Sequence, residues 1–147
     1  AWEFDSALKT WHIPYTEQEW ENVPSGKPAF KDNTESFKSV LSEIAELAYK
    51  IDCDNFAFIF EKALDTLNNT HNFIETPAKM PIPDIPEIHK RLFMAASTAD
   101  VFGAMGSWSD SPPYMAQDKG LGEEYESLSN ELLKQVRLAI LYAINEW

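Results

Sequence analysis

Apolar residues recur at intervals of three and four through four long segments, and this spacing constrains the fold more than any other feature of the chain. The segments begin near residues 33, 54, 85 and 122 and end near residues 51, 68, 102 and 147. Such spacing places the apolar side chains on one face of an α-helix. Glycine-rich hairpin signals and period-two runs are absent, so no sheet is expected, with a short N-terminal strand pair left open as the exception. The sequence therefore predicts an all-α fold: a single-domain bundle of about four main helices.

The first two helices are expected to form an antiparallel hairpin. Asn33 or Thr34 is expected to start the first helix, and the second is expected to end near Asn68. Between them the chain has only a short acidic interruption, in which Asp54 is a good N-cap. A connection this short favours antiparallel neighbours.

The third segment is the most apolar, so we expect its helix to be central. Asp84 is expected to cap it, with Pro86 in the first turn. Its last apolar position is Phe102, and Gly103 and Gly106 are expected to end it.

Beyond that helix, Pro112-Pro113 predicts a loop that continues to Gly122. The last helix is then expected to run from Gly122 to near Trp147. Residues 73–84, which hold three prolines, are expected to be an extended connection.

Residues 1–32 are expected to form an irregular arm beside the helical core of residues 33–147. Short helices are predicted at residues 5–11 and 17–22. The arm is expected to pack its aromatic side chains onto the core. These side chains are Trp2, Phe4, Trp11, Tyr15, Trp20 and Phe30.

The net charge narrows the possible functions of the chain more than any motif does. The 147 residues include 24 acidic and 12 basic side chains, for a formal net charge of −12. Such a chain repels phosphate backbones, so direct nucleic-acid binding is not expected. Two interpretations of the acidity stay open: it aids solubility, or it attracts a basic partner.

The sequence offers little for catalysis, metal binding or cofactor binding. His12, His71 and His89 are far apart and match no zinc motif, and phosphate-binding and dinucleotide-binding motifs are absent. Cys53 is the only cysteine, so an internal disulfide is excluded and a reducing cytosol is expected. The chain has no apolar run long enough for a membrane span and no signal-peptide pattern at its start. We therefore expect no enzyme, cofactor, metal or membrane association. A small enzyme using Cys53 or a pair of carboxylates stays open as the alternative.

Two acidic groups stand out as candidate binding surfaces. Glu17, Glu19 and Glu21 surround Trp20. The second group brackets an aromatic segment after the third helix, where carboxylates around aromatic rings would suit a basic protein surface. The residues of this second group that we expect to bind a partner are Asp100, Asp110, Tyr114, Asp118, Glu123 and Glu124.

The segment that follows the third helix reads DVFGAMGSWSD. It resembles the F-G-G-M-G-S-[WF]-N-D element of small bacterial proteins encoded beside polymorphic toxins. Those proteins resemble immunity proteins of contact-dependent growth inhibition systems. Ala104 replaces the second glycine of the element and Ser109 replaces its asparagine. The matching residues are Phe102, Gly103, Met105, Gly106, Ser107, Trp108 and Asp110.

The resemblance implies a non-enzymatic function. The protein would bind the basic C-terminal domain of a cognate toxin, often a nuclease, in the cytosol of its own cell. Its carboxylates would imitate the phosphates that the toxin's cleft normally holds. Within the element, residues 102–108 would be structural, while Asp110 and the residues beyond it would bind. A general interaction adaptor is the other non-enzymatic alternative.

Overall fold

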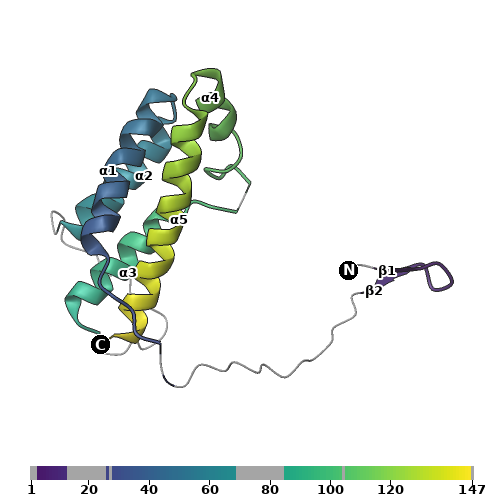
Figure 1. The fold of residues 1–147 in the computed structure, drawn as a ribbon, viewed down its shortest axis with the longest axis horizontal. Helices are drawn as coiled ribbons and strands as arrows, with labels where there is room; N and C mark the ends of the chain where they lie inside the picture. The colour runs from purple at the N-terminus through teal and green to yellow at the C-terminus, as the bar shows by residue number, and fades with distance from the viewer. Residues whose placement is uncertain (1–2, 13–25, 27, 69–84, 104, 147) are drawn as a thin grey trace.

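The computed structural model describes residues 3–12, 26, 28–68, 85–103 and 105–146 of the chain (Figure 1). Within these residues the all-α prediction is confirmed, with one small strand pair at the N-terminus. The helices are α1 (Thr34–Lys50), α2 (Asp54–Leu67), α3 (Glu87–Ala99), α4 (Pro112–Asp118) and α5 (Gly122–Asn145). The strands are β1 (Glu3–Asp5) and β2 (Thr10–His12).

Helices α1, α2, α3 and α5 form an antiparallel four-helix bundle (Figure 1). They run alternately in opposite directions; α2 lies against both α1 and α3, and α5 lies against both α3 and α1. Helix α4 packs on α5 near the turn that joins α1 to α2. The short α1–α2 connection enforces the first antiparallel pair, as the sequence predicts.

The core lies along the bundle axis and is built mainly from the apolar stripes of the helices. On α3 these residues are small: Ala95, Ala96 and Ala99 are fully buried, which lets α2 and α5 approach closely. Burial of each large aliphatic or aromatic side chain contributes roughly 1.5–3 kcal/mol. The largest fully buried side chains on the other three long helices are Phe37, Leu41, Ile44, Leu47, Phe60, Leu132 and Val136.

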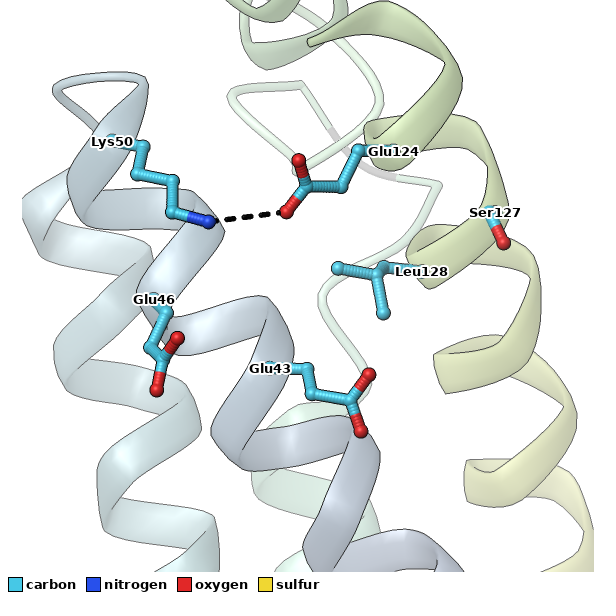
Figure 2. Close-up of a pocket in the computed structure, with 6 residues that line it drawn as sticks. All are labelled: Glu43, Glu46, Lys50, Glu124, Ser127 and Leu128. Carbon is cyan, nitrogen blue, oxygen red and sulfur yellow. Dashed lines mark hydrogen bonds and ion pairs between the residues drawn. The ribbon is translucent and has the colours of Figure 1, made fainter.

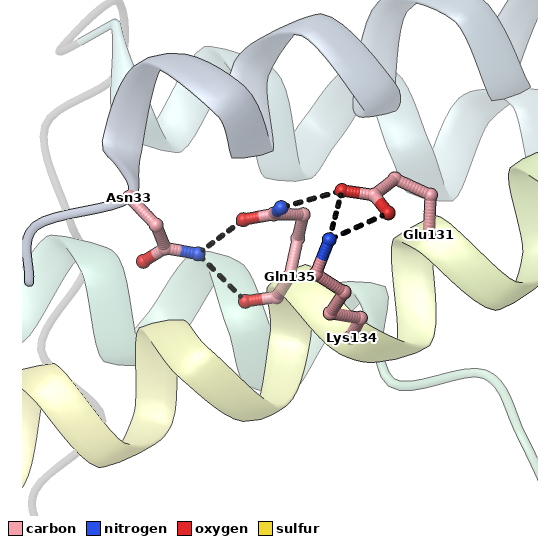
Figure 3. Close-up of polar contacts among 4 residues, drawn as sticks. All are labelled: Asn33, Glu131, Lys134 and Gln135. Atoms are coloured by element: carbon pink, nitrogen blue, oxygen red, sulfur yellow. Dashed lines mark hydrogen bonds and ion pairs between the residues drawn. The ribbon is translucent and has the colours of Figure 1, made fainter. Parts of the chain in front are cut away.

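The half-buried amide of Asn33 joins the start of α1 to α5 (Figure 3). The Asn33 side-chain nitrogen donates to the backbone oxygen of Gln135 at 2.9 Å and to its Oε1 at 2.7 Å. Gln135 in turn donates to Glu131 at 2.6 Å, and Lys134 also donates to that carboxylate. These two donors lower the pKa of Glu131. The chain of bonds sets the position of α1 along α5.

Helix α3 differs from the prediction at both ends and in its position. It starts at Glu87 with Pro86 as its N-cap residue, and it ends at Ala99 with Asp100 as its C-cap, so Phe102 lies outside it. It is not central, because a ring of four helices buries one face of each. Side chains beside that face, such as Phe93 at 43% exposure, therefore remain open to solvent.

The prediction of a loop from Pro112 to Gly122 is wrong, because α4 begins at Pro112. Proline suits the first turn of a helix, where its missing N–H has no partner to bond. Pro112 and Ala116 form the buried side of this helix. The start of α2 is also shifted by one residue: Cys53 is the N-cap position and Asp54 the first helical residue.

The N-terminal residues form a hairpin in which Phe4 pairs with Trp11, so the helix predicted at residues 5–11 is wrong. Asp5 Oδ1 accepts bonds from the N–H groups of Ala7 and Leu8 and so shapes the turn. Phe4 and Trp11 pack on each other with ring centroids 5.1 Å apart. Both rings are mostly exposed, which contradicts their predicted packing onto the core.

Phe30 is half-buried, and its N–H donates to Glu146 at 2.9 Å. Several predictions lie outside the described residues. These are the helix at 17–22, the connection at 73–84, the cap Asp84, the aromatics Trp2, Tyr15 and Trp20, and the acidic group of Glu17, Glu19 and Glu21.

Candidate functional site

Trp108, in the segment DVFGAMGSWSD that follows α3, is a core residue. Its ring is fully buried and meets Phe56 and Phe60 of α2 edge-on, at centroid distances of 5.2 and 5.3 Å. Tyr125 of α5 lies on its other side, 5.2 Å away. The indole Nε1 donates to Ser129 Oγ at 2.7 Å, which satisfies the one polar group of the buried ring.

The length of α3 explains why a loop residue occupies this place. At about 1.5 Å per residue, α3 spans roughly 20 Å and α5 roughly 36 Å. Beyond the last turn of α3, the space between α2 and α5 is filled by Trp108. The Trp108 N–H donates to the oxygen of Val101 at 3.0 Å, and this bond closes the loop.

The two glycines of the motif turn the backbone where other residues would be strained. Gly103 has a φ of +85° and Gly106 a φ of +79°, both in the left-handed region. Between them Met105 is fully exposed. Ser107 is buried, and its hydroxyl accepts a bond from the Ser109 N–H at 3.3 Å. Phe102 is half-buried and packs against the core.

Asp110 closes the loop from the outside. Its Oδ2 accepts hydrogen bonds from the N–H groups of both Gly106 and Ser107. The residue stays exposed to solvent. The carboxylate predicted to bind a partner therefore also holds the loop that presents it, a role that its position in the sequence does not indicate.

We call the α4 end the surface formed by residues 50–53, 100–103 and 105–126. Lys119, after α4, joins these parts: its ammonium donates to the backbone oxygen of Lys50 at 2.8 Å and to the Asp52 carboxylate. Lys50 Nζ forms an ion pair with Glu124 at 3.2 Å. Both bases are thus engaged with groups of the same chain.

The six predicted binding residues all belong to the α4 end. Tyr114 is 72% exposed, and Asp100, Asp110, Asp118 and Glu123 are also exposed. Glu124 is half-buried beside Lys50. Residues 100–126 contain six carboxylates and a single base, Lys119, so the local charge is strongly negative.

A shallow acidic groove of about 250 Å³ continues from the α4 end between α1 and α5 (Figure 2). Its acidic side chains are Glu43 and Glu46 of α1 and Glu124 of α5, with Lys50 between them. Glu43 and Glu46 were not predicted as part of this surface, because they join it only when α1 and α5 are neighbours. No local signal in the sequence shows that neighbourhood.

The surroundings of Cys53 disfavour its use as a nucleophile. Its Sγ is buried 3.5 Å from Met115 Sδ. Burial, then the charges of Asp52 and Asp54, raises the pKa of the Cys53 thiol. The thiol therefore stays protonated at neutral pH. The one histidine whose side chain is described, His89, stacks on Tyr142 and belongs to the first turn of α3, toward the opposite end of the bundle.

Within the described part of the chain, no group of three or more His, Cys, Asp or Glu side chains could hold a metal ion. Among the helices described, none has both the length and the apolar character that crossing a membrane requires. Comparison of the chain with protein-family models, with curated proteins and with solved structures finds no match.

Proposed function

We propose that this chain is an immunity protein of the bacterial cytosol. It binds the basic C-terminal domain of a cognate toxin, such as a nuclease, and neutralises it without catalysis. The observation that carries the proposal is the composition of the α4 end. There, exposed Asp118 and Glu123 accompany the exposed ring of Tyr114, while the bases Lys50 and Lys119 are paired within the chain.

This surface has the properties that a basic partner requires. Its negative potential would steer a cationic domain toward it and raise the association rate. Tyr114 offers the kind of aromatic anchor that dominates binding free energy at interfaces. The carboxylates would sit in the toxin's cleft where phosphates otherwise bind, and the bundle would block the substrate's path.

The segment that carries Asp110 is anchored at two points. Trp108 anchors it in the core, and the Asp110 carboxylate bonds two of its backbone N–H groups. Binding then orders few additional groups, so little of the interaction free energy is spent on conformational entropy.

An enzyme built on Cys53 has less support, because the thiol is buried and its pKa is raised. A general adaptor differs from an immunity protein mainly in its partner. The test is therefore binding to the toxin domain encoded by the neighbouring gene.

The experiment mixes the full chain with that toxin domain and measures affinity by calorimetry, with rescue of growth in cells that express the toxin. We expect a one-to-one complex. Asp118→Lys together with Glu123→Lys should weaken it by about tenfold or more, at roughly 1 kcal/mol for each reversed charge. The matched control reverses Glu35 and Asp65, in the first turn of α1 and late in α2. Absence of a complex, or equal weakening by both double variants, would contradict the proposal.

A further inference from the structure

Helix α2 carries an exposed aromatic ring that the bundle does not use. Phe58 is 66% exposed, whereas Phe56 and Phe60 of the same helix are buried. Residues three and four positions away are neighbours on a helix surface, so Asp54 and Asn55 border the Phe58 ring on one side and Glu61 and Lys62 on the other.

A second aromatic ring lies beside the same carboxylate. Tyr49, near the end of α1, is 47% exposed, and its hydroxyl donates to Glu61 Oε2 at 3.1 Å. This hydrogen bond, followed by burial and the charges of Glu61 and Asp54, raises the pKa of Tyr49. The phenol is therefore a stable donor that holds the Glu61 carboxylate in place. We name Tyr49, Asp54, Phe58 and Glu61 the Phe58 face.

The chemistry of this face matches one side chain better than others. A guanidinium group is flat, so it stacks on aromatic rings, and its N–H groups pair with carboxylates in a fixed plane. The ammonium of lysine is a compact, strongly hydrated charge without such a plane. Two exposed rings with two carboxylates, against the single base Lys62, thus complement arginine in both shape and charge.

We propose that the Phe58 face binds arginine side chains of a basic protein partner. The identity of that partner rests on the proposed function, whereas the preference for arginine does not. Asp54 follows directly on the α1–α2 turn, so the Phe58 face is continuous with the α4 end.

The first test needs no toxin. Two synthetic peptides of equal length and charge, one alternating arginine with glycine and one alternating lysine with glycine, are titrated into the full chain and followed by NMR. We expect the arginine peptide to bind at least about threefold more tightly, with shifts centred on residues 49–61. Equal affinities, or shifts confined to α4, would overturn the proposal.

Two variants test separately what the Phe58 ring and the Glu61 charge contribute to binding. Phe58→Ala should abolish the preference for arginine, and Glu61→Gln should weaken binding of both peptides while leaving the shape of the face intact. Phe93→Ala is the matched control, since Phe93 is an exposed ring on α3, which carries no part of the Phe58 face. Circular dichroism checks that each variant folds. An unchanged preference in Phe58→Ala would overturn the proposal.

The toxin complex and the oligomeric state distinguish the remaining outcomes. If the wild-type chain binds the toxin domain and Phe58→Ala binds it equally well, this inference is wrong and the proposed function stands. If no toxin complex forms but the arginine preference persists, the proposed function is wrong and this inference stands. Sedimentation that shows a dimer lost in Phe58→Ala would make the face a contact between two copies of the chain, which would also overturn the proposal.

Discussion

At the scale of single residues, Trp108 has the largest structural consequence. The sequence marks it only by its place between glycines and an aspartate, and a tryptophan in such a loop could equally face a partner. The structure buries it between Phe56, Phe60 and Tyr125, with its nitrogen bonded to Ser129. Its role depends on how far α3 extends, which no local pattern reports.

Replacing this ring should destabilise the whole bundle. Trp108→Ala leaves a large cavity and removes the partner of the Ser129 hydroxyl, so we expect a loss of roughly 3–5 kcal/mol in the free energy of unfolding. Urea denaturation followed by circular dichroism measures it. Trp11→Ala is the matched control: Trp11 is 63% exposed, and its loss should cost less than about 0.5 kcal/mol. Equal effects of the two substitutions would contradict the burial of Trp108.

Gly106 tests the backbone of the same loop. A Cβ atom there meets nothing within 4 Å, so any cost of Gly106→Ala comes from the left-handed φ of +79°. We expect a destabilisation of about 1 kcal/mol in the same urea assay. Gly122→Ala, at the start of α5 and without a positive φ, should be neutral or slightly stabilising. A loss at Gly122 as large as that at Gly106 would contradict the left-handed φ as the cause.

At the scale of elements, apolar spacing predicted α1, α2 and α5 closely because each has one long buried stripe. It failed at α3 and α4, where the end of one helix and the start of the next depend on tertiary contacts. Val101 leaves the helix because its oxygen accepts the Trp108 N–H, although residues 100–102 still fit the helical spacing. The carboxylates of the α4 end were predicted because they are close in sequence. Glu43, Glu61 and Phe58 were not predicted as surface sites. Each lies beside residues of another helix only after α1 packs against α5 and α2.

The contact between α1 and α5 should depend on pH through Glu131. Its folded-state pKa is lowered by bonds from Gln135 and Lys134, so the ionised form is favoured in the folded state. The resulting stability is present above the unfolded pKa of about 4.5 and is lost as the pH falls through the lowered folded value. Glu131→Gln removes this dependence. Urea unfolding of both proteins should show wild type the more stable at pH 7, with the difference shrinking toward pH 3. A constant difference between the two pH values would contradict this account.

At the scale of the whole molecule, the net charge of −12 matters because of where the carboxylates and the paired bases lie. In the described residues Lys38, Lys50, Arg91, Lys119 and Lys134 all form ion pairs with carboxylates. Exposed carboxylates remain at the α4 end and along the α1–α5 groove, so one side of the bundle presents a negative field. That distribution, more than the total charge, is what favours an oriented encounter with a cationic partner.

The negative field of this surface leads us to predict how salt changes the rate of association with the toxin domain. Steering by charge raises the association rate constant, and salt screens it over about 10 Å at 0.1 M. Stopped-flow mixing should therefore show association slowing by tenfold or more between roughly 0.01 and 0.5 M salt, while the dissociation rate changes far less. The double variant Asp118→Lys, Glu123→Lys should give a flatter salt dependence, because it removes the carboxylates that face the incoming partner. If association were equally fast at both salt concentrations, the acidic surface would serve solubility alone, and recognition would rest on the exposed rings of Tyr114 and Phe58.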